Sequence, residues 1–125
     1  MELSKLLSEL EKLNLPKGEY AIFGSGPPSA REIREARDLD ILASKKLYEK
    51  LILKYNAENE KIVIGNIEIF MNVRYVDNPE DVIRNAEMIH GYPFARLEDI
   101  LEWKKKMGRG KDIRDIELIK RYVTR

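Results

Sequence analysis

The sequence predicts one domain of the α/β or α+β class, in which helices flank a small mixed β-sheet. The chain has 125 residues, a length that fits one domain with its own hydrophobic core. Hydrophobic residues make up 43% and charged residues 36%, a balance typical of globular proteins. Helix-like and strand-like patterns follow one another without a repeat or a linker. We therefore expect residues 1–125 to form a single domain, with the helices packed on one side of the sheet.

The first third of the chain contains a helix and two strands. Leucines recur at helical spacing near the N-terminus, and the pattern ends before Pro16 and Gly18. A short apolar run and an alternation of acidic and apolar residues then predict two strands. The expected elements, in order, are a helix that contains the leucines and ends near Pro16 and Gly18, a strand over 19–23, a turn over 24–28, a loop or short helical turn over 29–37, and a strand over 38–42.

The middle of the chain predicts a helix and a β-hairpin. Ser44 is a suitable N-cap for a helix over residues 45–56, with its apolar side chains facing inward. Residues 61–64 are apolar and β-branched, and strand-like sequence resumes over residues 67–72. Gly65 and Asn66 between them form a suitable two-residue turn, so residues 61–72 are expected to form a hairpin.

The remainder of the chain is expected to be mostly helical. Asn78 and Pro79, followed by two acids, are typical of a helix start. Gly91 and Pro93 then break the chain. Two further helices are expected from apolar residues at helical spacing, and glycines separate them. These apolar residues are Leu97, Ile100, Leu101 and Met107 in the first of the two, and Ile113, Ile116, Ile119 and Val123 in the second.

Composition excludes several kinds of site. The sequence contains no cysteine, which excludes disulfides and thiolate metal ligands. His90 is the only histidine, which argues against structural zinc and against a histidine-based triad elsewhere. A net charge of +1 gives no global electrostatic reason to expect nucleic acid binding. No apolar run is long enough to span a bilayer and no signal peptide is visible, so we expect a cytoplasmic protein without a membrane partner.

One group of residues carries a chemical signal. Gly24 and Ser25 follow the first predicted strand, and Asp38 and Asp40 lie in the second. Side chains alternate along a strand, so the two carboxylates should point to one face and repel each other unless a cation lies between them. Carboxylate and phosphate oxygens suit Mg²⁺, and Gly24 and Ser25 suit close contact with phosphate. The alternative is a pair of acids on the solvated face of an edge strand.

The Gly-Ser turn followed by Asp-x-Asp resembles the signature of the DNA polymerase beta-type nucleotidyltransferase superfamily. The resemblance implies a nucleotidyltransferase fold with the acids at an exposed edge of the sheet. It implies that Ser25 contacts phosphate and that Asp38 and Asp40 hold Mg²⁺ or Mn²⁺. A third acid on a later strand usually completes such a site, and Glu68 is the best match, although the family more often has Asp there.

Basic residues add to this prediction. Arg31, Arg34 and Arg37 precede the acids, and either a solvated face or an anion contact explains them. Family members often have an arginine here, which favours Arg34 or Arg37. The C-terminal third also resembles small toxin-type and antibiotic-modifying-type relatives, in which a lysine at the position of Lys104 lies near the nucleotide. The alternative for the basic cluster at residues 104–111 is complementation of a helix dipole.

The resemblance implies transfer of a nucleoside monophosphate from a magnesium-bound nucleoside triphosphate to an acceptor hydroxyl. Many active relatives carry a further helical domain that binds the acceptor, and this sequence has none. A second copy of the chain or a small helical partner protein is therefore expected to complete the acceptor site, unless the open face of the domain does so. Two alternatives remain, namely an inactive interaction module with the same fold and the nucleotidyltransferase of a toxin–antitoxin pair.

Overall fold

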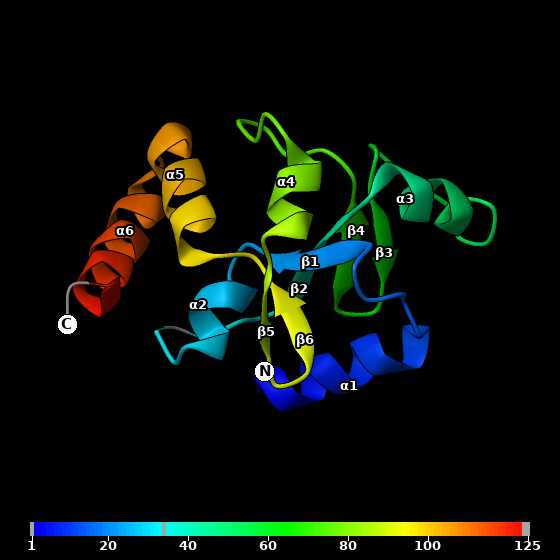
Figure 1. Ribbon diagram of the computed structural model, residues 1–125, viewed down its shortest axis with the longest axis horizontal. Coiled ribbons are helices and arrows are strands. Elements are labelled where there is room, and N and C mark those ends of the chain that lie inside the picture. Colours follow the sequence, from blue (N-terminus) through cyan, green and yellow to red (C-terminus); the bar gives the residue numbers. More distant parts are fainter. Residues whose placement is uncertain (1, 34, 124–125) are drawn as a thin grey trace.

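A computed structural model describes residues 2–33 and 35–123, and Figure 1 shows its arrangement. In this part of the chain, six strands and six helices form a mixed α/β domain. The elements are α1 (Leu3–Leu13), β1 (Tyr20–Phe23), α2 (Gly26–Ala30), β2 (Leu39–Ala43), α3 (Lys45–Leu51), β3 (Ile62–Ile64), β4 (Ile67–Phe70), α4 (Pro79–Arg84), β5 (Glu87–Ile89), β6 (Tyr92–Phe94), α5 (Leu97–Met107) and α6 (Gly110–Val123).

The strands form one mixed sheet in the order β3-β4-β2-β1-β6-β5. The pair β1–β2 is antiparallel, whereas β2–β4 and β1–β6 are parallel. Antiparallel hairpins, β3–β4 and β5–β6, close the two edges. The strands β2 and β4, which carry Asp40 and Glu68, are therefore interior strands. The expectation that the acids lie at an exposed edge of the sheet is wrong for these two residues.

Helices cover both faces of the sheet, so the expectation of helices on one side is also wrong. Along β1, Tyr20 and Ile22 pack into a cluster with the leucines of α1, while Ala21 and Phe23 pack into a second cluster with α4, α5 and α6. Figure 1 shows α1 below the sheet, α4 above it, and the α5–α6 pair beyond one end of the strands. The physical reason is that every residue of β1 is buried, so both faces of this strand require apolar cover.

Several local predictions are confirmed. The N-terminal helix is present as α1 and ends at Leu13, ahead of Pro16. The side chain of Ser44 caps α3 by accepting a hydrogen bond of 3.1 Å from the backbone N–H of Leu47. The hairpin β3–β4 turns at Gly65 and Asn66, with Ile64 opposite Ile67. The helix α3 is shorter than the predicted range of residues 45–56. It ends at Leu51, and turns follow it.

Two elements differ from the sequence prediction. The segment predicted as a proline-containing turn forms the short helix α2, whose prolines occupy its first turn, where no backbone N–H donor is required. Gly91 and Pro93 do not break the chain, since they belong to the hairpin β5–β6. His90 and Gly91 form its two-residue turn, with φ angles of 53° and 82°.

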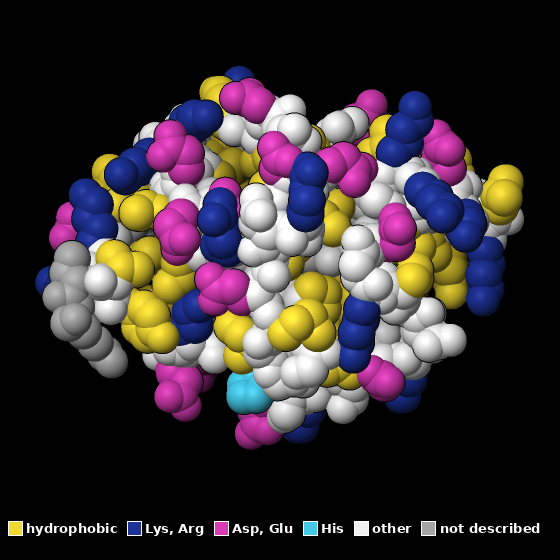
Figure 2. Space-filling model, in the orientation of Figure 1, with side chains coloured by type: hydrophobic (Ala, Val, Ile, Leu, Met, Phe, Trp, Pro, Cys, Tyr) yellow, Lys and Arg dark blue, Asp and Glu magenta, His cyan; other side chains and the backbone are white. Residues whose placement is uncertain are grey.

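The surface mixes charges of both signs. Figure 2 shows basic and acidic side chains interspersed over one face of the described residues, in keeping with the net charge of +1. None of the described helices is both long enough and apolar enough to cross a membrane.

Candidate active site

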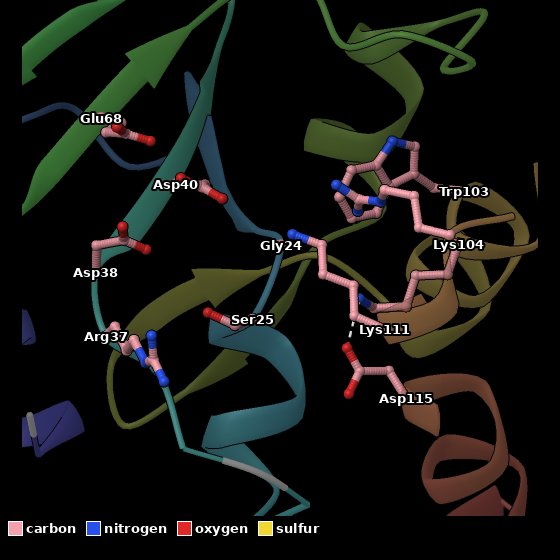
Figure 3. Close-up of a pocket in the computed structure, with 11 residues that line it drawn as sticks. Gly24, Ser25, Arg37, Asp38, Asp40, Glu68, Trp103, Lys104, Lys111 and Asp115 are labelled. Carbon is pink, nitrogen blue, oxygen red and sulfur yellow. Dashed lines mark hydrogen bonds and ion pairs between the residues drawn. The ribbon is translucent and has the colours of Figure 1, made fainter. Parts of the chain in front are cut away.

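A cavity of about 470 Å³ lies between the sheet and the α5–α6 pair. The seven site residues proposed from the sequence all line it, although they come from four separate segments of the chain. These residues are Gly24, Ser25, Arg37, Asp38, Asp40, Glu68 and Lys104. Four further residues complete the lining, namely Trp103, Arg109, Lys111 and Asp115. Figure 3 shows three acidic side chains, Asp38, Asp40 and Glu68, on the β2–β4 side, and two lysines together with Asp115 on the opposite side.

The acidic wall comes from neighbouring parallel strands. Asp40 of β2 and Glu68 of β4 are register partners, so their side chains stand next to each other on one face of the sheet. Asp38 immediately precedes β2 and lines the same cavity. Both carboxylates therefore line one cavity, although Asp38 lies in a bend before β2 and not within the strand as predicted.

The carboxyl group of Asp40 is in an unfavourable place for a negative charge. Burial, a hydrogen bond shared with Glu68, and the negative charges of Asp38 and Glu68 together raise the pKa of Asp40 to about 7, against a small opposing effect of Lys61. At pH 7 the wall therefore carries a carboxyl group that is readily protonated, or that a bound cation can keep ionised.

Glu68 is already engaged in an ion pair. Its Oε1 lies 3.2 Å from Nζ of Lys61, and both side chains are partly exposed. Among residues 2–33 and 35–123, no three aspartate, glutamate, histidine or cysteine side chains converge in the geometry of a metal site. As a third ligand, Glu68 would have to use its other carboxylate oxygen or leave Lys61.

The Gly24–Ser25 turn joins β1 to α2 at the floor of the cavity. Gly24 has a φ of 64°, a conformation that favours glycine, and a β-carbon on it would lie 2.5 Å from Oδ2 of Asp40. Ser25 is partly exposed at the start of α2, and its side chain forms no capping hydrogen bond. Figure 3 shows its hydroxyl group directed into the cavity, where it is available to a ligand.

The opposite wall is built on a buried ionic cluster. Lys104 is only 4% exposed, and its Nζ lies 2.9 Å from Asp115 Oδ2 and 3.5 Å from Asp112 Oδ1. Arg109 donates to Asp112 through its backbone N–H and through its guanidinium group. Although burial opposes ionisation, these hydrogen bonds hold the pKa of Asp112 below its usual value. The predicted phosphate ligand, Lys104, is therefore already neutralised by protein carboxylates.

Two other basic residues of the cavity remain available. Arg37 and Lys111 are both exposed, and neither forms an ion pair with any residue that the structure describes. Figure 3 shows the Lys111 side chain extending from the start of α6 toward the Gly24 side of the cavity. Arg34, the other arginine favoured by the resemblance, lies outside the described residues.

Sequence reasoning did not select Lys111, Trp103 or Asp115 as site residues. Lys111 was visible only as one of several basic residues in the cluster at residues 104–111. The available signal was the glycine pair Gly108 and Gly110, because a chain reversal there returns the start of α6 to the wall formed by α5.

Comparison of the chain with protein-family models, curated proteins and solved structures finds no match.

The arrangement combines two complementary halves. Asp38 and Asp40 form one half, which lacks an ion-pair partner within the described residues and suits a hard cation. Arg37, Lys111 and the Ser25 hydroxyl form the other half, which suits an anion rich in oxygen atoms. A ligand that combines a divalent cation with a phosphate chain satisfies both halves.

Proposed function

We propose that this protein is a nucleotidyltransferase, which moves a nucleoside monophosphate from a magnesium-bound nucleoside triphosphate to an acceptor hydroxyl group. The observation that carries the proposal is one cavity in which Asp38 and Asp40 face Lys111 across the cavity, with Arg37 beside Asp38. None of these four side chains has an ion-pair partner among the described residues. The proposal includes a nucleotidyltransferase fold, which is supported by the Gly-Ser turn directly after β1 and by carboxylates on the adjacent strands β2 and β4.

The donor set fits a divalent cation. Asp38 and Asp40 lie in one cavity, and the pKa of Asp40 is raised to about 7. A cation bound between the two carboxylates would offset their mutual repulsion. Mg²⁺ typically takes one or two protein carboxylates and completes its coordination with water and substrate phosphates. Asp38 and Asp40 would hold the ion, and when bound it would supply charge neutralisation for the phosphates.

The remaining residues have roles in binding and proton transfer. The Ser25 hydroxyl would donate a hydrogen bond to a phosphate oxygen, and the Arg37 guanidinium would balance negative charge on the phosphate chain. The acceptor hydroxyl oxygen would attack the α-phosphorus, and the bond to the bridging oxygen of pyrophosphate would break. Glu68 is the proposed third carboxylate, as a metal ligand or as the acceptor of the hydroxyl proton, and its Oε1 is paired with Lys61 in this structure.

The experiment follows the position of the label. Protein is incubated with Mg²⁺ and each nucleoside triphosphate labelled either at the α- or at the γ-phosphorus, in the presence of protein, RNA or small-molecule hydroxyl acceptors. Nucleotidyl transfer predicts that the α-label, and not the γ-label, becomes attached to an acceptor. The Asp38→Asn/Asp40→Asn variant should lose this activity, while the matched control Asp77→Asn, an exposed acid outside the cavity, should retain it. Transfer of the γ-label would instead identify a kinase, and transfer that survives in the double variant would exclude the proposed carboxylates.

A further inference from the structure

We infer that Lys111, rather than Lys104, is the lysine that binds the polyphosphate chain of the substrate. The inference rests on the proposed function, because it names a contact within the same site. It is carried by the different surroundings of the two lysines. One is enclosed by carboxylates of the protein, and the other is exposed within the cavity without an ion-pair partner in the described part of the chain.

Lys104 is committed to structure. Its ammonium group lies within 4.0 Å of two carboxylates, those of Asp112 and Asp115, and its side chain is 5% exposed. A phosphate bound to this group would have to displace a buried ion pair, which would leave a buried carboxylate without its partner. Lys104 therefore joins α5 to α6 and is poorly suited to exchange partners during a catalytic cycle.

Arg109 is committed in a similar way. Its guanidinium group forms two hydrogen bonds with the carboxylate of Asp112, which is fully buried, and it lies 5.7 Å from the ring of Trp103. Two donors aligned on one carboxylate form a strong and geometrically specific pair. This pair fixes the turn between α5 and α6, and Lys111 lies between its two members in sequence.

Lys111 combines a fixed base with an available charge. Its neighbour Asp112 is anchored through both the backbone N–H and the side chain of Arg109, so the backbone that carries Lys111 is held in place. The Lys111 side chain is exposed, lines the cavity and extends toward the side that carries Gly24 and the carboxylates. An ammonium group in this position would meet the phosphates of a nucleotide held at Asp38 and Asp40.

The test measures binding rather than activity. Isothermal titration calorimetry with magnesium ATP and with magnesium tripolyphosphate is performed on the wild type and on Lys111→Ala, Lys111→Arg and Lys105→Ala. Lys111→Ala should raise the Kd for both ligands by about 10- to 100-fold, the usual cost of losing one charge-assisted hydrogen bond. Lys111→Arg should recover much of the affinity. The matched control Lys105→Ala, an exposed lysine of α5 outside the cavity, should bind like the wild type.

The outcomes separate this inference from the proposed function. Wild-type binding with an unchanged Kd in Lys111→Ala would overturn the assignment of Lys111 and leave the proposed function standing. Weaker binding of ATP with unchanged binding of tripolyphosphate would also overturn it, because Lys111 would then contact the nucleoside. Failure of folded wild-type protein to bind either ligand would contradict the proposed function itself, and the inference would fall with it.

Discussion

The carboxylate of Asp40 lies against the backbone of Gly24, so closely that a β-carbon at residue 24 would be 2.5 Å from Oδ2. The two residues come from the antiparallel strands β1 and β2, near the register pair of Phe23 and Asp40. The contact links the turn proposed to bind phosphate to the proposed metal ligand. It also explains why glycine is required at this position for two independent reasons, namely the positive φ and the lack of space for a side chain.

We predict that Gly24→Ala displaces the Asp40 carboxylate and weakens magnesium-dependent nucleotide binding. Alanine in a left-handed conformation should also cost about 1–2 kcal/mol of folding free energy. Gly91→Ala is the matched control, because Gly91 also has a positive φ but a β-carbon added to it would have nothing within 4 Å. Both variants should lose stability in urea denaturation, while only Gly24→Ala should lose binding. Equal binding by the two variants would show that the Gly24–Asp40 contact is unimportant for the site.

We predict that Asp40→Asn stabilises the metal-free protein at alkaline pH. The folded-state pKa of Asp40 is about 7 and its ordinary value is 3.8, so the folded state binds more protons between these values. Stability contributed by this group is full below pH 3.8 and is lost as the pH rises through 7. At pH 8 the free energy of unfolding of the variant should therefore exceed that of the wild type by on the order of 2 kcal/mol. This difference is smaller than the full pKa shift implies, because Asp40 retains some solvent contact.

The same comparison at low pH is the internal control. Near pH 4 the side chain is protonated in the folded wild type, so the two proteins should have nearly equal free energies of unfolding. Thermal or urea denaturation in a chelating buffer measures both values. A wild type that is more stable than Asp40→Asn at pH 8 would contradict the described environment of Asp40.

We predict that Lys104→Met is strongly destabilising. Removal of the ammonium group leaves Asp112 and Asp115 buried without their shared cation, which typically costs about 3–5 kcal/mol. Lys105→Met, at an exposed position of the same helix, should change stability by less than about 0.5 kcal/mol. If urea denaturation gives similar midpoints for the two variants, the buried cluster does not hold α5 against α6.

Much of the fold could be predicted from local sequence signals. Leucine spacing identified α1, the Ser44 cap identified the start of α3, and Gly65 with Asn66 identified the turn of β3–β4. Each of these signals acts over a few residues, so the surrounding fold did not have to be known. The hairpin β5–β6 was missed because Gly91 and Pro93 are ordinarily chain breakers. Proline is tolerated here because hydrogen-bonded and non-hydrogen-bonded pairs alternate along an antiparallel ladder. Ile89 and Tyr92 form the pair that closes the turn, so the next pair, Met88 and Pro93, needs no hydrogen bond.

Seven of the residues that line the candidate site were predictable, whereas Lys111 and the ion pairs of the site were not. The close spacing of Asp38 and Asp40 was enough to predict that both line one cavity, although Asp38 precedes the strand β2. Whether a given lysine is neutralised depends on which carboxylates the fold brings to it. The pairing of Lys104 with Asp115, eleven residues away in sequence, arises from the packing of α5 on α6. The adjacency of Asp40 and Glu68 likewise depends on the parallel pairing of β2 with β4.

The most direct test of the proposed site is calorimetric binding of each nucleoside triphosphate with and without Mg²⁺, on the wild type and on Asp38→Asn/Asp40→Asn. The proposal predicts that the wild type binds at least one triphosphate only when Mg²⁺ is present, and that the folded double variant does not. Binding that is independent of Mg²⁺, or that is equal in the two proteins, would contradict a metal-triphosphate site at Asp38 and Asp40. Absence of binding by folded wild-type protein would contradict it as well.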